Sequence, residues 1–69
     1  MNTYTVNVSS LEVRKDVKER SKIMLIRGTI VKAVDTPSKM HNHQRWIKIV
    51  TVNEPTVCGY VQLKYLSHL

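Results

Sequence analysis

Apolar and polar residues alternate at several places along the chain. Tyr4, Val6 and Val8 alternate with polar residues, and Leu11 and Val13 resume the alternation after a pair of serines. In an extended strand every second side chain lies on the same face, so each segment predicts a strand with one buried face. Residues 15–21 are polar and predict a loop.

Two short apolar runs continue this pattern on either side of a glycine. Residues 22–26 and 30–34 are each too short for a typical helix, and Arg27-Gly28-Thr29 separates them. Glycine adopts positive φ without a Cβ clash, which tight reversals often require. We therefore expect two strands joined at Gly28.

The second half contains the longest polar segment and the longest strand candidate. Residues 35–45 are polar, and Pro37 suits the second position of a turn, so we expect a loop. Residues 46–52 predict a strand with Ile47 and Ile49 on one face and Trp46 on the other, together with Lys48 and Val50.

The chain closes with one more predicted strand, at residues 57–61, after a turn at residues 53–56. A one-turn helical segment is expected near residues 62–64, followed by a short pairing segment at Tyr65 and Leu66. Many short strands at close spacing favour a small barrel or sandwich. The predicted fold class is all-β.

Size and composition limit the architecture. A chain of 69 residues with 42% hydrophobic and 23% charged residues is ordinary for one folded domain, so we treat residues 1–69 as a single domain. Phe is absent and Trp46 is the one tryptophan. The core must therefore come mainly from Val, Ile and Leu, a mixture that favours strands.

The charge balance favours anionic partners. Eleven Lys and Arg residues against five Asp and Glu residues give a net charge of +6. Net charge sets long-range attraction without specifying what is attracted. Nucleic acid, an acidic protein surface and an anionic cell-wall polymer all satisfy it.

The N-terminal residues bear on the cellular location of the protein. They have neither a basic opening nor a continuous apolar run, so no secretory signal is predicted, and no segment is suited to span a membrane. We expect a cytoplasmic protein with no membrane partner, such as a small phage or accessory product, unless the chain is a fragment of a wall-associated protein. A single cysteine, Cys58, excludes a disulfide within the chain.

Four motifs in order resemble the bacterial SH3-like (SH3b) family. They are Leu11-Glu12-Val13-Arg14, Arg27-Gly28-Thr29, Trp46-Ile47-Lys48-Ile49 and the closing Gly59-Tyr60-Val61 with Tyr65-Leu66. The resemblance spans residues 11 to 66. It implies a small SH3-like β-barrel of five to six short strands with a one-turn helix before the last strand, and recognition rather than chemistry. Residues 15–18 and the longer segment before Trp46 depart from the family pattern.

The candidate binding residues are aromatic or basic. Flat amphipathic rings give large contact areas, and the resemblance implies an aromatic groove between two loops. A structural role in the core is the alternative for each ring. Basic side chains could bind carboxylates or phosphates, or could simply keep the surface solvated. The predicted ligand-binding residues are Trp46, Tyr4, Tyr60, Tyr65, Arg14, Lys15, Lys18, Arg20, Arg45 and Lys48.

Catalytic and metal sites are not predicted. His41 and His43 supply at most half of a tetrahedral zinc shell, and no recognised ligand spacing is present, so we expect no metal and no cofactor. Cys58 lies inside an apolar run and is expected to be a small buried packing residue. With no catalytic residues assigned, the chain is predicted not to be an enzyme.

Three functions follow, in order of preference. The first is a non-enzymatic SH3-like module that recognises a protein or peptide of acidic character through an aromatic groove and basic loops. The second is a peptidoglycan-targeting domain of a phage or bacterial hydrolase, as the resemblance most often implies. The third is a small nucleic-acid-binding β-barrel, which would combine a basic groove with stacking aromatic rings.

Overall fold

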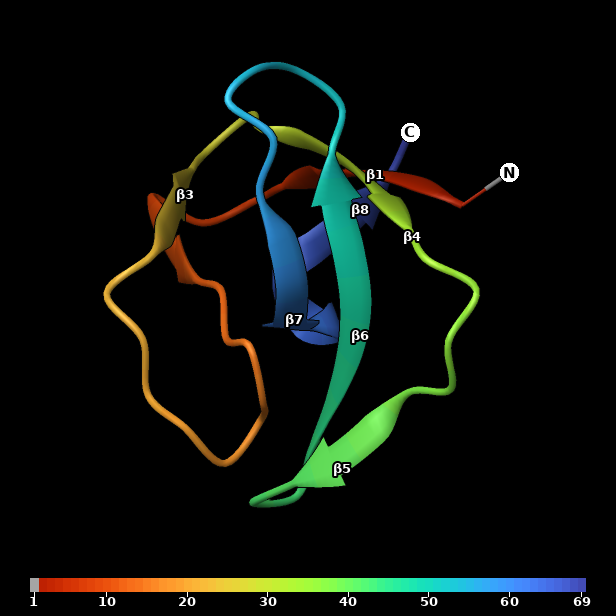
Figure 1. The fold of residues 1–69 in the computed structure, drawn as a ribbon. Coiled ribbons are helices and arrows are strands. Elements are labelled where there is room, and N and C mark those ends of the chain that lie inside the picture. Colours follow the sequence, from red (N-terminus) through yellow and green to blue (C-terminus); the bar gives the residue numbers. More distant parts are fainter. Residues whose placement is uncertain (1) are drawn as a thin grey trace.

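The computed structural model describes residues 2–69. Within them the chain forms eight short strands and one turn of 3-10 helix, so the all-β prediction is confirmed (Figure 1). The elements are β1 (Thr3–Val6), β2 (Ser10–Glu12), β3 (Met24–Ile26), β4 (Ile30–Ala33), β5 (Lys39–His41), β6 (Gln44–Thr51), β7 (Cys58–Gln62), η1 (Leu63–Tyr65) and β8 (Leu66–His68). The helical turn precedes the last strand, as the sequence predicts.

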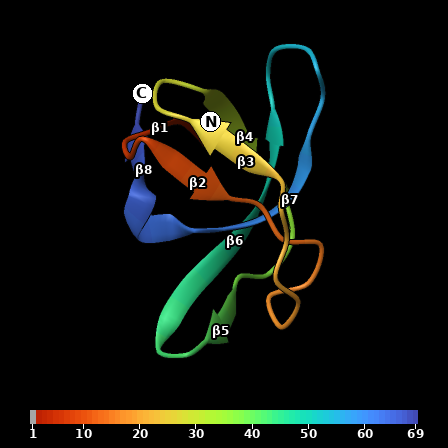
Figure 2. The same cartoon turned by 90° about the vertical axis from the view of Figure 1, so that its left-hand side faces the viewer.

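The strands form two antiparallel sheets. The larger sheet has the order β5-β6-β4-β1-β8, and β7 pairs with β6. β2 and β3 form a separate two-stranded sheet, and Figure 2 shows them side by side on one wall of the molecule. Paired backbone hydrogen bonds of 2.9 and 2.7 Å between Arg14 and Tyr60 connect the end of β2 to β7.

The main core lies between the two sheets. Val6, Val31, Ile49 and Val61 are almost fully buried there, together with Leu11 from the smaller sheet. Their side chains come from strands far apart in the sequence, so closing the sheets around one another buries them. As predicted, Ile49 faces this core; Ile47 is half-buried against it.

The contact between β2 and β7 requires a glycine. A Cβ on Gly59 would lie 2.7 Å from the Arg14 carbonyl oxygen and 2.8 Å from Val13 Cγ1, which is closer than real Cβ contacts. The two backbones can approach closely enough to form the Arg14–Tyr60 bonds because residue 59 has no side chain. Gly28, in contrast, has φ +89° and open space around it, so its turn needs glycine for the backbone conformation alone.

The segment predicted as a long loop, residues 35–45, contains a hairpin instead. β5 pairs with the start of β6, and Asn42 and His43 form the two-residue turn with φ of 51° and 63°. Positive φ at both central residues is the type I′ pattern that matches the twist of paired strands. The prediction missed it because His is an unusual residue for the second turn position. This hairpin and the short β8 raise the strand number above the expected five to six.

Residues 2–69 include no helix that is long and apolar enough to cross a bilayer.

Candidate functional site

A small second core lies on the outer face of β6 and β7. It consists of Trp46, Tyr60 and Val17, with 3%, 6% and 4% of their surfaces exposed. The strand register explains the pairing of the rings, because Trp46 lies opposite Gln62 and Lys48 opposite Tyr60, so both rings project from the same face. This is the face predicted for Trp46, but it is covered.

The loop of residues 13–23 provides the cover. Val17 packs on the rings, and the Arg14 guanidinium lies 4.6 Å from the centre of the Trp46 ring. Arg14 Nη1 also donates a 2.6 Å hydrogen bond to the Val17 carbonyl oxygen, which ties the loop to the arginine. A cation over an indole face is favourable, so charge and packing hold the loop down together.

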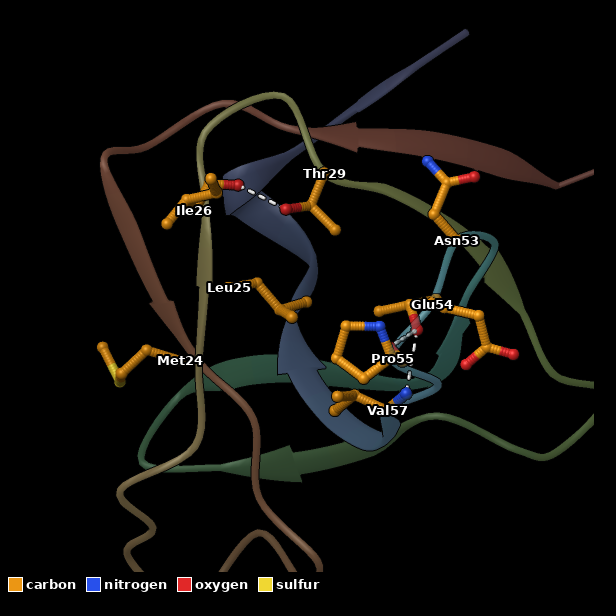
Figure 3. Close-up of a pocket in the computed structure, with 9 residues that line it drawn as sticks. Met24, Leu25, Ile26, Thr29, Asn53, Glu54, Pro55 and Val57 are labelled. Carbon is orange, nitrogen blue, oxygen red and sulfur yellow. Dashed lines mark hydrogen bonds between the residues drawn. The ribbon is translucent and has the colours of Figure 1, made fainter.

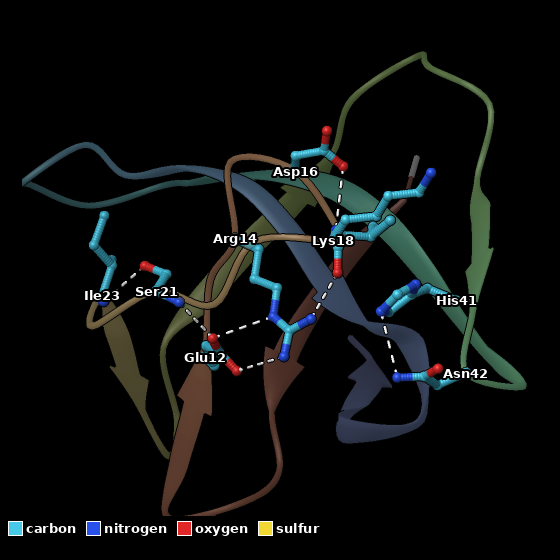
Figure 4. A network of polar contacts seen from close by, with 9 residues as sticks. Glu12, Arg14, Asp16, Lys18, Ser21, Ile23, His41 and Asn42 are labelled. Atoms are coloured by element: carbon cyan, nitrogen blue, oxygen red, sulfur yellow. Dashed lines mark hydrogen bonds and ion pairs between the residues drawn. The ribbon is translucent and has the colours of Figure 1, made fainter.

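A carboxylate fixes the arginine from the other side (Figure 4). Arg14 Nη2 donates to Glu12 Oε1 at 3.2 Å, and Arg14 Nε lies 3.1 Å from Glu12 Oε2 in an ion pair that lacks the direction of a hydrogen bond. The backbone N–H of Ser21 donates a 2.7 Å hydrogen bond to the same Glu12 Oε2. Glu12 therefore joins both ends of the loop.

These contacts change the acidity of Glu12. The hydrogen bond from Arg14 lowers the pKa of the Glu12 carboxyl below its usual value, and the Ser21 N–H and the charges of Arg14 and Arg20 add to this effect. Burial acts in the opposite direction but does not overcome it. The ionised carboxylate is thus the form that holds the loop closed.

Residues 2–69 do not form the accessible aromatic groove expected from the sequence. Trp46 and Tyr60 are sealed under the loop, and Tyr4 is buried in the main core, where the His68 ring is tilted against it with 4.4 Å between the ring centres. Tyr65 is half-buried and lies apart from the Trp46 cluster, packed against the main core. The rings became core because a small domain without Phe needs them for burial. The Trp46 Nε1 hydrogen is buried without a partner among residues 2–69.

The predicted basic residues do not converge on one site. Arg14 is engaged with Glu12, and Arg45 donates to Ser38 Oγ at 2.7 Å. Lys48 is half-buried across from Tyr60, where Lys39 Nζ also lies 4.8 Å from the ring centre. The others are exposed on the covering loop: Lys15, Lys18 and Arg20.

An exposed apolar surface lies on β3 and on the residue before it, where the sequence predicted no site. Ile23, Met24 and Ile26 expose 52%, 48% and 72% of their surfaces. We call these three residues the β3 surface. The sequence did contain a signal, because strict alternation around the buried Leu25 would have placed polar residues at positions 24 and 26.

A cavity of about 330 Å³ adjoins the β3 surface (Figure 3). It lies between β3 and the connection from β6 to β7, with Leu25, Pro55 and Val57 in its lining. Figure 3 shows Leu25 directed toward Pro55 and Val57, whereas Met24 and Ile26 point away from them. β3 therefore has apolar side chains on both faces, with Leu25 directed toward the cavity and Met24 and Ile26 directed away from it.

The two predictions about His and Cys chemistry have different outcomes. Cys58 is exposed, so the prediction of a buried packing residue is wrong. It falls at the first position of β7, on the face opposite the main core. His43 is the second residue of the hairpin turn, His41 is the last residue of β5 before it, and His41 Nε2 lies 3.3 Å from Asn42 Nδ2. Among residues 2–69, no three His, Cys, Asp or Glu side chains converge as a metal site.

The chain matches no family model, no curated protein and no solved structure.

Proposed function

We propose that this chain is a non-enzymatic recognition module of SH3-like type, which binds a protein segment of acidic character at the β3 surface. The observation that carries the proposal is the exposure of three large apolar side chains close to one another in sequence, Ile23, Met24 and Ile26, of which the last two also border an apolar-lined cavity. Clustered exposed apolar residues rimmed by polar ones are typical of interaction sites. Isolated ones need no such explanation.

The rim of the β3 surface supports the acidic character of the partner. Lys22 precedes β3, Arg27 follows it, and Arg20 lies nearby on the covering loop; all three are exposed. The net charge of +6 adds long-range attraction for an anionic segment. Apolar contacts would supply affinity, and the basic rim would supply orientation and a faster association rate.

The burial of the aromatic rings weighs against the nucleic-acid alternative. Single-stranded nucleic acid is bound by stacking bases on exposed aromatic faces in a basic groove. Trp46 and Tyr60 offer no such faces while the loop covers them. A protein segment that contacts aliphatic side chains does not require them.

The proposal is tested by selecting binders from a random library of twelve-residue peptides. We expect enriched peptides that combine aliphatic with acidic residues. Binding of an enriched peptide should fall at least tenfold in Met24→Ser and in Ile26→Ser, because each removes apolar contact worth roughly 1.5–3 kcal/mol when fully buried. Fluorescence anisotropy measures the affinity.

Met40→Ser is the matched control. Met40 is an exposed apolar residue on β5, outside the β3 surface, and its substitution should leave affinity unchanged. Failure to enrich any peptide, or equal loss of affinity in Met40→Ser and Ile26→Ser, would contradict the proposed function.

A further inference from the structure

The hydrogen-bond pattern of the two-stranded sheet defines which edge of β3 is open. The Val13 N–H donates to the Ile23 carbonyl oxygen at 2.9 Å, and the register pairs Leu11 with Leu25 and Glu12 with Met24. In antiparallel sheets, hydrogen-bonded and non-hydrogen-bonded pairs alternate. The Val13–Ile23 pair is hydrogen-bonded, so the Glu12–Met24 pair is not, and the N–H and C=O of Met24 point away from β2.

These backbone groups have no partner among the described residues. β3 pairs with β2 alone, and no hydrogen bond from another segment of residues 2–69 reaches the N–H or C=O of Met24 or the N–H of Ile26. The Ile26 carbonyl oxygen is occupied, since it accepts from the N–H and the hydroxyl of Thr29 at 3.1 and 2.7 Å. The open edge thus offers two donors and one acceptor, spaced two residues apart.

The space beside this edge is also available. The cavity between β3 and the β6–β7 connection lies along it, and Figure 2 places that connection on the side of β3 away from β2. Edge strands with unpaired backbone groups and apolar side chains are templates for pairing with another chain, and proteins normally protect them with charges, proline or a covering segment. β3 has apolar residues at all three of its positions.

We infer that the partner segment adds to β3 as an extended strand, with its backbone bonded to Met24 and Ile26. This inference rests on the proposed function and specifies how that site binds. Strand addition obtains affinity from main-chain hydrogen bonds and specificity from pockets that accept alternate side chains. Here one face of the added strand would pack on Met24 and Ile26, and the other would enter the cavity beside Leu25.

Charge identifies the occupant as a segment with an apolar centre and acidic ends. Lys22 and Arg27 flank β3, and Arg27 Nη1 donates a 2.7 Å hydrogen bond to the Asn7 carbonyl oxygen. Carboxylates on the two ends of the added strand would meet the Lys22 ammonium and the remaining N–H groups of Arg27. The Glu54 carboxylate at the cavity is held by the N–H and hydroxyl of Thr56, and it disfavours an acidic residue at the centre. A second copy of this chain is disfavoured, because antiparallel pairing of two β3 edges would bring Lys22 of one copy near Arg27 of the other.

The test uses a synthetic nine-residue peptide with a central Val-Thr-Val-Thr-Val segment and two glutamates at each end. Val and Thr favour extended structure. Two further peptides carry N-methyl groups on alternate central residues, one version for each edge of the added strand, so that one of them loses the N–H that would bond to the Met24 carbonyl oxygen. We expect that version to bind about 5-fold more weakly or worse, since the lost hydrogen bond costs about 1 kcal/mol.

A proline substitution tests the same bonds from the side of the protein. Met24→Pro removes an N–H that the β2–β3 ladder does not use, and proline is tolerated at edge strands where the N–H faces solvent. It should reduce affinity clearly more than Met24→Ala, which removes the side chain and keeps the N–H. The amide spectrum of each variant reports whether the fold is intact. If Met24→Pro does not fold, the methylated peptides still decide the question.

The possible outcomes separate strand addition from the proposed function. Weaker binding of one methylated version, and of a peptide with lysines in place of the glutamates, supports the inference. Equal binding of the unmodified and both methylated peptides at the β3 surface overturns strand addition and leaves the proposed function standing. Absence of binding by the unmodified peptide, or a dimer in sedimentation with β3 at its interface, overturns the inference; the library selection decides the proposed function independently.

Discussion

Two apolar regions outside the main core differ in whether another segment covers them. The outer face of β6 and β7 carries the rings of Trp46 and Tyr60, and the loop of residues 13–23 seals them. The β3 surface has smaller side chains that no segment of residues 2–69 covers, and within that part of the chain its backbone edge is open. The difference shows that residue type alone does not locate a binding surface. An apolar face is available for binding only where no other segment of the chain covers it.

The largest expected effect tests the covered region as core. Trp46→Ala should lower the free energy of unfolding by about 3–5 kcal/mol, because it leaves a cavity under the loop and removes the partner of Arg14. Thermal or urea denaturation measures this change. The control Met40→Ala, at an exposed position, should stay within about 0.5 kcal/mol of the parent. A stable Trp46→Ala protein that has lost only peptide binding would restore the ring as a recognition residue.

Replacing the glycine of each region by alanine should destabilise the protein for different reasons. Gly59→Ala should destabilise by about 1–3 kcal/mol or more, because the added methyl group collides with backbone and with Val13. Gly28→Ala meets nothing within 4 Å and should cost about 1–2 kcal/mol from its positive φ alone. Denaturation of both variants measures the difference. A loss of less than about 1 kcal/mol for Gly59→Ala would contradict the close approach of β2 and β7.

The ion pair that closes the loop predicts a pH dependence. Because Arg14 lowers the pKa of Glu12 in the folded state, the unfolded chain binds that proton more readily and stability rises with pH. This contribution is present above the ordinary glutamate pKa, near 4.3, and is lost as pH falls toward the lower folded value.

Glu12→Gln isolates that contribution. Glu12→Gln should lower the free energy of unfolding by about 1–2 kcal/mol at pH 7, because it weakens a partly exposed hydrogen bond between charged groups. It should also make stability less dependent on pH in the acid range. Denaturant titrations from pH 3 to 7 measure it. Glu19→Gln, on the same loop and exposed, is the control and should change neither quantity. Parallel acid limbs for the parent and Glu12→Gln would contradict the role of this carboxylate.

The smallest expected change in stability comes from the turn of the β5–β6 hairpin. His43 holds φ of 63° in the type I′ turn, a conformation that costs residues with a side chain roughly 1–2 kcal/mol relative to glycine. His43→Gly should therefore stabilise the protein by about 0.5–1 kcal/mol after the greater entropy of glycine in the unfolded chain is included. A rise in melting temperature of a few degrees is the expected reading. Destabilisation would mean that the His43 side chain makes a contact that the turn needs.

The sequence predicted most of the framework because period-two alternation directly reflects burial on one face. Val6, Leu11 and Ile49 fall where the alternation places them, and Gly28 marks the expected reversal. The β5–β6 hairpin was missed because its turn uses Asn42 and His43 without a glycine. The pairing register and the twist of the hairpin require positive φ at these two residues, and the local amino-acid composition does not indicate such a requirement.

The site was harder to predict because burial of a ring depends on a distant segment. Nothing in the residues around Trp46 indicates that Val17 and Arg14 will cover it; that follows from the path of the loop and from the contact of Gly59 with Arg14. The β3 surface was overlooked for the opposite reason. Its continuous apolar run predicted a strand without indicating which faces are buried, and only the pairing of β3 with a single neighbour shows that two of its side chains remain outside.

The most direct test of the central claim is a map of amide and indole shifts in the two-dimensional NMR spectrum during titration with an enriched peptide. The account predicts the largest shifts at residues 23–29 and 51–57, with the Trp46 indole N–H signal unchanged. Shifts centred on that indole signal and on residues 14–21 would show instead that the loop opens and that the covered rings are the binding site.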